Sequence, residues 1–149
     1  MNLVSPLIYN GQPLRGYGVD ADTGDIYSTR RSKQPHKLAW NHRNKRSLKD
    51  SYPCMRFTSK TVFPDHHSNG LTINVHILIH ETLNPLPVPP GVSDKEWKRT
   101  PVSVKQAMRG SWMVNHIDHN RLNYHPSNLE WVFGARENAQ RAKAHYSEG

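Results

Sequence analysis

The chain has 149 residues, of which 35% are hydrophobic, with a formal net charge of +8 and a single cysteine. This length fits one domain, and a mean hydropathy of −0.80 predicts a small core beneath a large polar surface. One cysteine excludes a disulfide framework and a cysteine-based zinc site within the chain. The sequence has no run of about 18 apolar residues and no charged segment leading into an apolar one, so we expect a soluble, cytoplasmic protein that does not bind a membrane.

The positive charge is concentrated in one segment. Between Arg30 and Lys60 ten lysines and arginines stand against one acid, Asp50, which gives this segment +9 and leaves −1 for the rest of the chain. Such a concentration predicts contact with nucleic-acid phosphates, and a solvated basic loop is the alternative. The residues expected to contact DNA are Arg30, Arg31, Lys33, Lys37, Arg43, Lys45, Arg46 and Lys49.

The first predicted elements in chain order are strands. Residues 16–28 read as two short strands around a turn at 22–24, where Asp, Thr and Gly interrupt residues that favour strands. Tyr52–Phe57 reads as a further strand. Trp40, within the basic segment, could stack on a base or lie in the core.

The middle of the chain predicts a strand that leads into a helix. Asp65–Gly70 reads as a turn and Leu71–Val75 as a strand. From Asn74 or Val75 the apolar spacing becomes helical and Pro85 ends the helix. The apolar side of this helix would carry Leu78, Ile79 and Leu83.

The next segment predicts two short helices after an extended, proline-rich connector at 84–92. Ser93 would cap the first helix, which has acids in its first turn. The second would run from Val102 to Arg109 and end at Gly110.

The last forty residues predict a hairpin followed by a helix. Strands are expected at Ser111–Ile117 and Leu129–Phe133, with a long loop at 118–128 between them and a helix at 134–145. This ββα unit, with small antiparallel strands and short helices before it, gives the fold class α+β.

The stretch Val114–Val132, VNHIDHNRLNYHPSNLEWV, concentrates three histidines and four asparagines beside good strand formers. The pattern VNHIDHN…SNLEWV…EN resembles HNH nucleases of the His-Me-finger type, as in phage and intron-encoded homing endonucleases. Two upstream segments, GVDADTGDIYS and NVHILIHETL, are similar to segments of the same enzymes.

The resemblance implies a metal-dependent endonuclease that nicks or cuts double-stranded DNA in a bacterial or phage-infected cell. Residues 1–62 would form a basic DNA-contacting region, and 63–149 an HNH domain with its ββα unit at 111–146. His116 would be the general base, and Asn128 would hold the loop and so the imidazole. Asn115 and Asn138 would bind one Mg²⁺ or Mn²⁺ through their amide oxygens, with Asp118 in an outer shell.

Departures from the family pattern keep other interpretations open. Aspartate is common where this chain has Asn115, and histidine is common at Asn138. His119 stands where glycine is common, so we expect a different turn there. A DNA-binding protein without catalysis, an RNA-directed nuclease and a homodimer all remain alternatives.

His76 and His80 are four residues apart on the expected helix, which is a metal-ligand spacing. A zinc site with His66 or His67 is therefore one interpretation. We favour another, in which His76 packs beneath the hairpin and holds it by hydrogen bonds. Trp112 and Trp131 are expected in the core.

Overall fold

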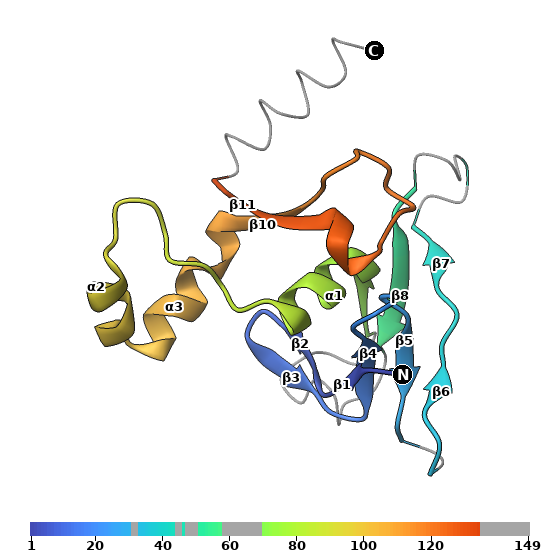
Figure 1. Ribbon diagram of the computed structural model, residues 1–149. Helices are drawn as coiled ribbons and strands as arrows, with labels where there is room; N and C mark the ends of the chain where they lie inside the picture. Colours follow the sequence, from blue (N-terminus) through green and yellow to red (C-terminus); the bar gives the residue numbers. More distant parts are fainter. Residues whose placement is uncertain (31–32, 44–45, 47–50, 58–69, 135–149) are drawn as a thin grey trace.

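The structure of the protein is a computed structural model that describes residues 1–30, 33–43, 46, 51–57 and 70–134. It combines small antiparallel sheets with a few short helices, so the predicted α+β class is confirmed (Figure 1). The expected turn at 65–70, apart from Gly70, and the expected helix at 134–145, apart from Gly134, lie outside the described residues. The described helices are all too short to cross a membrane.

Three antiparallel sheets come from the first half of the chain. One has the strand order β1-β4-β5-β6, the second is the hairpin β2-β3, and the third has the order β7-β8-β9. Their bounds are β1 Leu3–Val4, β2 Leu7–Tyr9, β3 Gln12–Leu14, β4 Tyr17–Asp20, β5 Ile26–Ser28, β6 His36–Lys37, β7 Asn41–His42, β8 Pro53–Phe57 and β9 Leu71–Asn74.

The helices and the last hairpin follow in the second half. The helices are α1 Val75–Leu83, α2 Asp94–Arg99 and α3 Val102–Met108, and the 3₁₀ turns are η2 Arg109–Ser111 and η3 Pro126–Asn128. The strands β10 Trp112–His116 and β11 Leu129–Phe133 pair antiparallel. The strands predicted for the hairpin and the three predicted helices up to Met108 are therefore found within two residues of their expected bounds.

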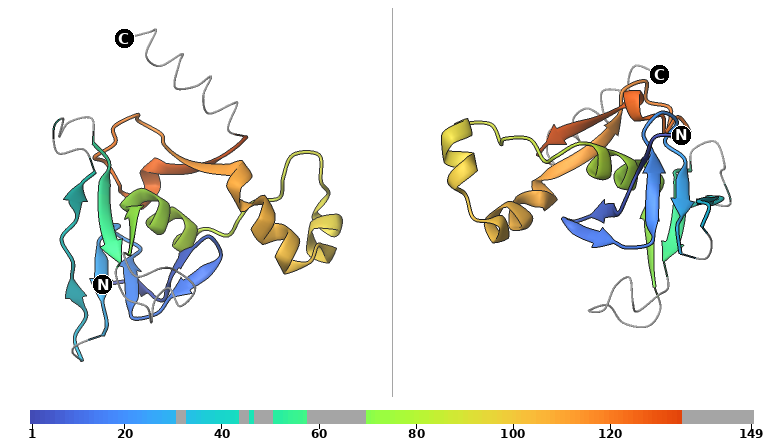
Figure 2. Two further views of the ribbon diagram at one scale, coloured as in Figure 1. Left: turned by 180° about the vertical axis from the view of Figure 1, so that it is seen from behind. Right: turned by 60° about the horizontal axis from the view of Figure 1, so that its bottom comes forward.

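Helix α1 lies at the centre of the molecule, between the N-terminal strands and the hairpin β10–β11 (Figures 1 and 2). Its apolar residues Val75, Leu78 and Ile79 recur at helical spacing on one face and are fully or almost fully buried. They join one core cluster with residues of the sheets, including Leu7, Val19, Phe57 and Leu129. This cluster, and the sheet pairing of β8 with β9, draw residues from both sides of the boundary expected at 62–63.

The hairpin β2–β3 was not expected, although the sequence contains a signal for it. Asn10 and Gly11 form its turn with φ angles of 50° and 75°. A two-residue turn with two positive φ angles fits the twist of antiparallel strands, and Asn-Gly is its preferred sequence. The apolar residues around Asn-Gly are too few to give a clear strand pattern.

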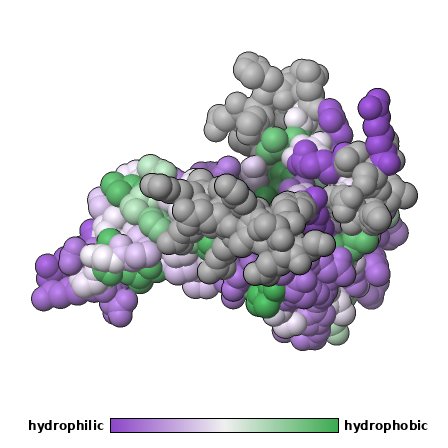
Figure 3. All heavy atoms as spheres, turned by 90° about the horizontal axis from the view of Figure 1, so that it is seen from above, coloured by the Kyte–Doolittle hydropathy of each residue, from purple (hydrophilic) through white to green (hydrophobic). Residues whose placement is uncertain are grey.

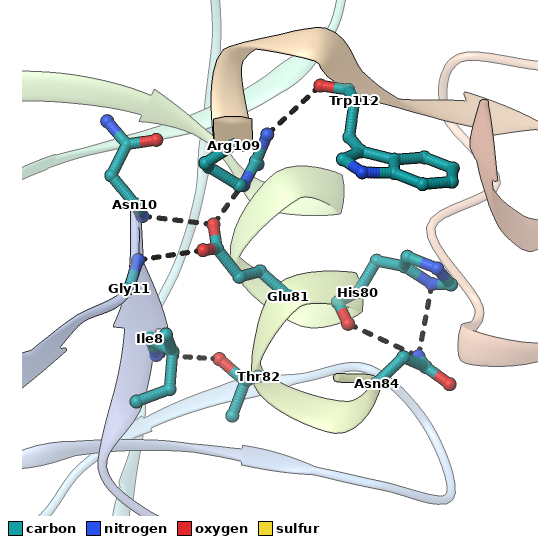
Figure 4. Close-up of polar contacts among 9 residues, drawn as sticks. All are labelled: Ile8, Asn10, Gly11, His80, Glu81, Thr82, Asn84, Arg109 and Trp112. Carbon is teal, nitrogen blue, oxygen red and sulfur yellow. Dashed lines mark hydrogen bonds and ion pairs between the residues drawn. The ribbon is translucent and has the colours of Figure 1, made fainter. Parts of the chain in front are cut away.

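A buried carboxylate on α1 connects this turn to the hairpin β10–β11 (Figure 4). Glu81 accepts hydrogen bonds from the backbone N–H groups of Asn10 (3.0 Å) and Gly11 (2.9 Å). It also pairs with Arg109 at 3.1 Å, and the two side chains are 8% and 12% exposed. Arg109 in turn donates to the carbonyl of Trp112 at 3.0 Å and lies over the ring of Trp131.

Helices α2 and α3 form an arm that projects from the body (Figures 1 and 2). Seen from above, the arm shows both hydrophilic and hydrophobic surface (Figure 3). Ser93 caps α2 as predicted, because its hydroxyl accepts from the Glu96 N–H at 3.1 Å. Trp97 is the buried residue of α2, whereas α3 has none.

The buried ion pair gives the first prediction. Glu81→Ala leaves a buried guanidinium and two turn N–H groups without their acceptor, so we expect the free energy of unfolding to fall by about 3–5 kcal/mol. The double variant Glu81→Ala/Arg109→Met should lose less than the sum of the two single variants. Urea unfolding measures both.

Asp94→Ala, at an exposed carboxylate on α2, is the control and should change the free energy of unfolding by less than about 1 kcal/mol. A Glu81→Ala protein as stable as this control would show that the ion pair does not support the fold.

Candidate active site

The two faces of the hairpin β10–β11 carry different chemistry. Successive residues of a strand point to opposite faces, and residues paired across strands share a face. His116 pairs with Leu129, whose side chain is in the core next to α1. Asn115 pairs with Glu130 on the other face. The expected base and the expected metal ligand therefore leave β10 in opposite directions.

His116 lies at the end of β10 in a cluster of aromatic rings. Its ring centroid is 4.5 Å from that of His76 on α1 and 5.8 Å from that of Tyr52, which precedes β8. His116 is 5% exposed, and its Nε2 atom is buried without a hydrogen-bond partner among the described residues. Among the described residues, α1 is the element that faces the His116 ring, and the helix expected at 134–145 lies outside them apart from Gly134.

Burial keeps both imidazoles neutral. Desolvation lowers the pKa of His116 below its usual value, with the Asp118 carboxylate opposing the shift and the Arg121 cation adding to it. Desolvation, followed by the nearby His116, His80 and Arg43, lowers the pKa of His76 to about 3. A neutral His116 at pH 7 can accept a proton, as a general base must.

The loop after β10 is held by the amide of Asn128. Its Oδ1 accepts from the N–H of Asp118 at 3.1 Å, and its Nδ2 donates to Asp118 Oδ1 and to the carbonyl of Asn123, both at 2.9 Å. The carbonyl of Asn128 accepts from the N–H of Ile117 at 2.7 Å. Asn128 therefore fixes the backbone on either side of residue 117, directly after His116.

Asp118 is the second organiser of this loop. Its carboxylate accepts from the N–H of Asn120 at 2.8 Å and from Nδ2 of Asn123 at 2.9 Å, in addition to Asn128. These hydrogen bonds, that from Asn123 first, lower the pKa of Asp118 below 3.8. The hydrogen bonds of the Asp118 carboxylate all lie within the loop. Its expected role in the outer shell of a metal stays a prediction.

His119 adopts a backbone conformation that glycine prefers. Its φ angle is 61°, and its N–H donates to the carbonyl of His116 at 3.0 Å. A side chain in this left-handed region is strained. The tight turn that glycine would favour is therefore formed here despite the histidine.

Asn115 and Glu130 lie side by side on the other face of the hairpin. Nδ2 of Asn115 donates to Oε1 of Glu130 at 3.0 Å, which turns the amide oxygen of Asn115 away from that contact. Amide and carboxylate oxygens are hard donors and fit Mg²⁺ or Mn²⁺. The described residues contain no group of three or more His, Cys, Asp or Glu side chains suited to a metal, and Asn138 lies outside them.

The same loop is attached to the N-terminal sheet. The hydroxyl of Tyr124 donates to Asp25 at 3.1 Å, and Asp25 also pairs with Lys37 at 3.5 Å. Gly24 lies against the backbone of Tyr124, where an added Cβ would be 2.8 Å from the carbonyl oxygen. The β4–β5 turn thus supports the loop that follows His116.

The basic residues of the segment 30–49 lie on and beside the edge strands β6 and β7. Five of the eight expected DNA contacts are described and exposed: Arg30, Lys33, Lys37, Arg43 and Arg46. Arg31, Lys45 and Lys49 lie outside the described residues. Arg43 also serves the fold, since it donates to Asn74 Oδ1 at 2.7 Å and to the Thr72 carbonyl at 3.0 Å.

The two histidines of α1 have different surroundings. The ring of His80 contacts Trp131 at 5.0 Å, and its Nδ1 lies 3.1 Å from Asn84 Nδ2. His76 instead packs on His116, and its Nδ1 has no hydrogen-bond partner among the described residues. His76 thus lies beneath the hairpin as predicted. It contacts the hairpin through its ring, whereas we expected hydrogen bonds. His66 and His67, the other ligands of the zinc interpretation, lie outside the described residues.

Three residues of the site were missed by the sequence analysis. Tyr52 stacks on both site histidines, Arg121 places its guanidinium 4.9 Å from the centre of the Tyr52 ring, and Glu130 holds Asn115. For Glu130 the sequence offers a signal, since it lies within the Asn-Leu-Glu-Trp-Val run. For Tyr52 no local pattern distinguishes this ring from any other half-buried tyrosine.

One comparison with known proteins gives a match. A solved structure described as "DNA binding and cleavage by the HNH homing endonuclease I-HmuI" is similar to this chain, with 22% sequence identity and a TM-score of 0.49. The match covers 89% of this chain and 55% of that chain, so the present chain spans about half the length of its match. No protein-family model and no curated protein matches the sequence.

The hydrogen bonds of Asp118 give a prediction for acid. A carboxylate whose pKa is lowered by folding stabilises the folded state above its usual pKa, and this contribution disappears as the pH falls through the lowered value. We therefore expect the protection factors of the loop amides, which compare their exchange with that of an unfolded chain at the same pH, to fall below pH 3.8, the usual value for Asp118.

In Asp118→Asn the protection of these amides should depend less on pH over this range. In Asp94→Asn, at an exposed site on α2, it should depend on pH as in the unmodified protein. Equal acid dependence in Asp118→Asn and in the unmodified protein would contradict the role of this carboxylate.

Proposed function

We propose that this chain is a metal-dependent endonuclease that hydrolyses a phosphodiester of double-stranded DNA. The observation that carries the proposal is the state of His116. It is a neutral imidazole at the end of a strand, followed directly by a loop that Asn128 and Asp118 hold in one conformation. The resemblance of VNHIDHN…SNLEWV to HNH nucleases supports the role of base for the same histidine.

His116 would take the proton from the attacking water. Because Nε2 is buried among protein atoms, Nδ1 is the nitrogen that we assign to this step. Asn128 would act indirectly, through the backbone of residues 117 and 118, since its amide bonds to the loop. A general base of this kind contributes about 10²–10⁴-fold to a rate.

Asn115 and Asn138 would bind the divalent cation, and Glu130 is a further oxygen donor beside Asn115. When bound, the cation supplies charge that stabilises the phosphate in the transition state and the departing 3′ oxygen. Glu130 orients the Asn115 amide by accepting from its Nδ2. A neutral amide binds a cation less strongly than an aspartate would, so we expect weak metal affinity without DNA.

The edge strands β6 and β7 would contact DNA. A groove of about 700 Å³ adjoins them, and the described polar residues that line it include no acid. They are Tyr17, Ser28, Arg30, His36, Asn41 and Arg56. Such a surface suits the phosphate backbone of a duplex, and exposed edge strands can enter a groove of DNA.

A DNA-binding protein without catalysis is the second candidate. The neutral Asn115 favours it, because the amide already has a partner in Glu130. A nicking assay with Mg²⁺ or Mn²⁺ separates it from the nuclease. Competition between duplex DNA and duplex RNA separates both from an RNA-directed nuclease, because A-form RNA does not open its major groove to a strand pair.

The assignment of the base gives a prediction. His116→Ala should lower the rate at which supercoiled plasmid is nicked in Mg²⁺ or Mn²⁺ by about 10²-fold or more, since no other described group replaces the base. DNA binding, measured by fluorescence anisotropy, should be unchanged. Nicking at the unmodified rate by His116→Ala would refute the assignment.

The basic segment gives a second prediction. Changing Lys45 and Arg46 to Gln should weaken DNA binding and reduce the slope of log K against log salt by roughly 1–2. The reason is that binding releases fewer counterions from the DNA for each phosphate contact that is lost. The matched control removes the same charge from α2 by changing Lys95 and Lys98 to Gln, both exposed. Equal slopes in the two double variants would mean that net charge, and not this segment, determines the salt dependence.

A further inference from the structure

The environment of His116 contains a feature that the proposed function does not explain. Three rings from distant parts of the chain meet there, those of Tyr52, His76 and His116. Tyr52 and His76 stack at 5.0 Å with 29° between their planes, and Tyr52 and His116 at 5.8 Å with 27°. His76 and His116 are closest, at 4.5 Å.

Each supporting ring is itself held in place. The carbonyl of Tyr52 accepts from the N–H of Arg43 at 3.0 Å, and the guanidinium of Arg121 lies over the Tyr52 ring at 4.9 Å. His76 is in the first turn of α1 and is 5% exposed. The imidazole of His116 therefore cannot turn about χ2 without moving the rings of His76 and Tyr52.

The contact between the two histidines depends on ring shape. The Nδ1 atom of His76 is buried and has no hydrogen-bond partner among the described residues, and neither has Nε2 of His116. A buried polar atom without a partner is unfavourable and needs an explanation. Here the position demands a flat, uncharged ring, because a cation 4.5 Å from His116 would oppose protonation of the base.

We propose that His76 and Tyr52 are positioning residues for cleavage, whose packed rings fix the plane of the His116 imidazole so that Nδ1 faces the attacking water. The inference rests on the proposed function. It assigns to α1 a part in the reaction besides its place in the core. The rings touch neither DNA nor the cation, and they act on the rate through His116 alone.

Helix α1 offers a matched control. His80 is one turn after His76, is buried to a similar degree at 6% exposed, and lacks a partner for Nε2 among the described residues. Its ring contacts Trp131 and not His116. Removing either imidazole should destabilise the fold, whereas removing His76 alone should change the orientation of His116.

The experiment compares His76→Ala, His76→Phe and His80→Ala in single-turnover nicking of supercoiled plasmid with Mn²⁺, with DNA affinity and melting temperature measured on the same proteins. We expect His76→Ala to lower the single-turnover rate by about 10–100-fold, as a displaced catalytic group does. DNA affinity should not change. His76→Phe should recover most of the rate, and His80→Ala should lose melting temperature but not rate.

Three results would overturn the proposal. They are an unchanged rate in His76→Ala, a loss of rate in His80→Ala as large as in His76→Ala, and recovery by His76→Gln but not by His76→Phe. The last result would indicate a hydrogen bond in place of ring packing. If His76→Ala does not fold, Tyr52→Leu and Tyr52→Phe test the same arrangement from the other side, with only the phenylalanine variant expected to keep the rate.

A readout without DNA distinguishes failure of this inference from failure of the proposed function. Aromatic rings stacked on His116 should shift its ring proton resonances, assigned by their absence in His116→Ala. Tyr52→Leu should remove much of this shift, whether or not the protein cleaves. If no nicking occurs but the shift is found, the proposed function fails and the ring arrangement remains; if the shift is absent, the positioning role fails.

Discussion

The buried ion pair of Glu81 and Arg109 joins three parts of the chain that are far apart in sequence. Glu81 is on α1, its two turn partners are Asn10 and Gly11, and Arg109 reaches the first residue of β10. A buried carboxylate needs several donors to offset its desolvation, and here they come from two elements, the β2–β3 turn and η2. The hairpin that carries His116 is consequently fixed against both the helix beneath it and the N-terminal strands.

The ion pair fixes α1, the β2–β3 turn and β10 relative to one another, and short-range contacts then hold the residues of the candidate site. Asn128 and Asp118 share hydrogen bonds across the loop after β10, and Tyr124 attaches that loop to Asp25 of the first sheet. The rings of Tyr52 and His76 then bound the imidazole. A reaction that moves one proton requires a fixed distance, and contacts from several elements provide it more firmly than one loop could.

Much of this arrangement could be predicted from the sequence. The other features could not, and the reasons are physical. Helix α1 was predicted because Leu78, Ile79 and Leu83 lie at helical spacing before a proline, and the hairpin because Val114 and Trp131 flank a loop rich in Asn. The strands β1, β6 and β7 are two residues long, too short for any alternation to appear. Tyr52 reaches the site through the pairing of β8 with β9, a contact between segments that no local pattern reveals. The ring contact of His76 was predicted as a hydrogen bond, since sequence gives the neighbour but not its orientation.

The opposite orientation of Asn115 and His116 limits where a phosphate can sit. In the described chain β10 pairs only with β11, so the ribbon is a single layer, two strands wide, with one long side of β10 left open. The face that carries His116 is packed against α1, so a phosphate could lie only over the other face, where it would meet Asn115 and miss His116. Under the proposed function, a DNA backbone would have to pass around the edge of β10 near residue 116 to reach both side chains, and a duplex along that edge would present its strand edge-on to the protein.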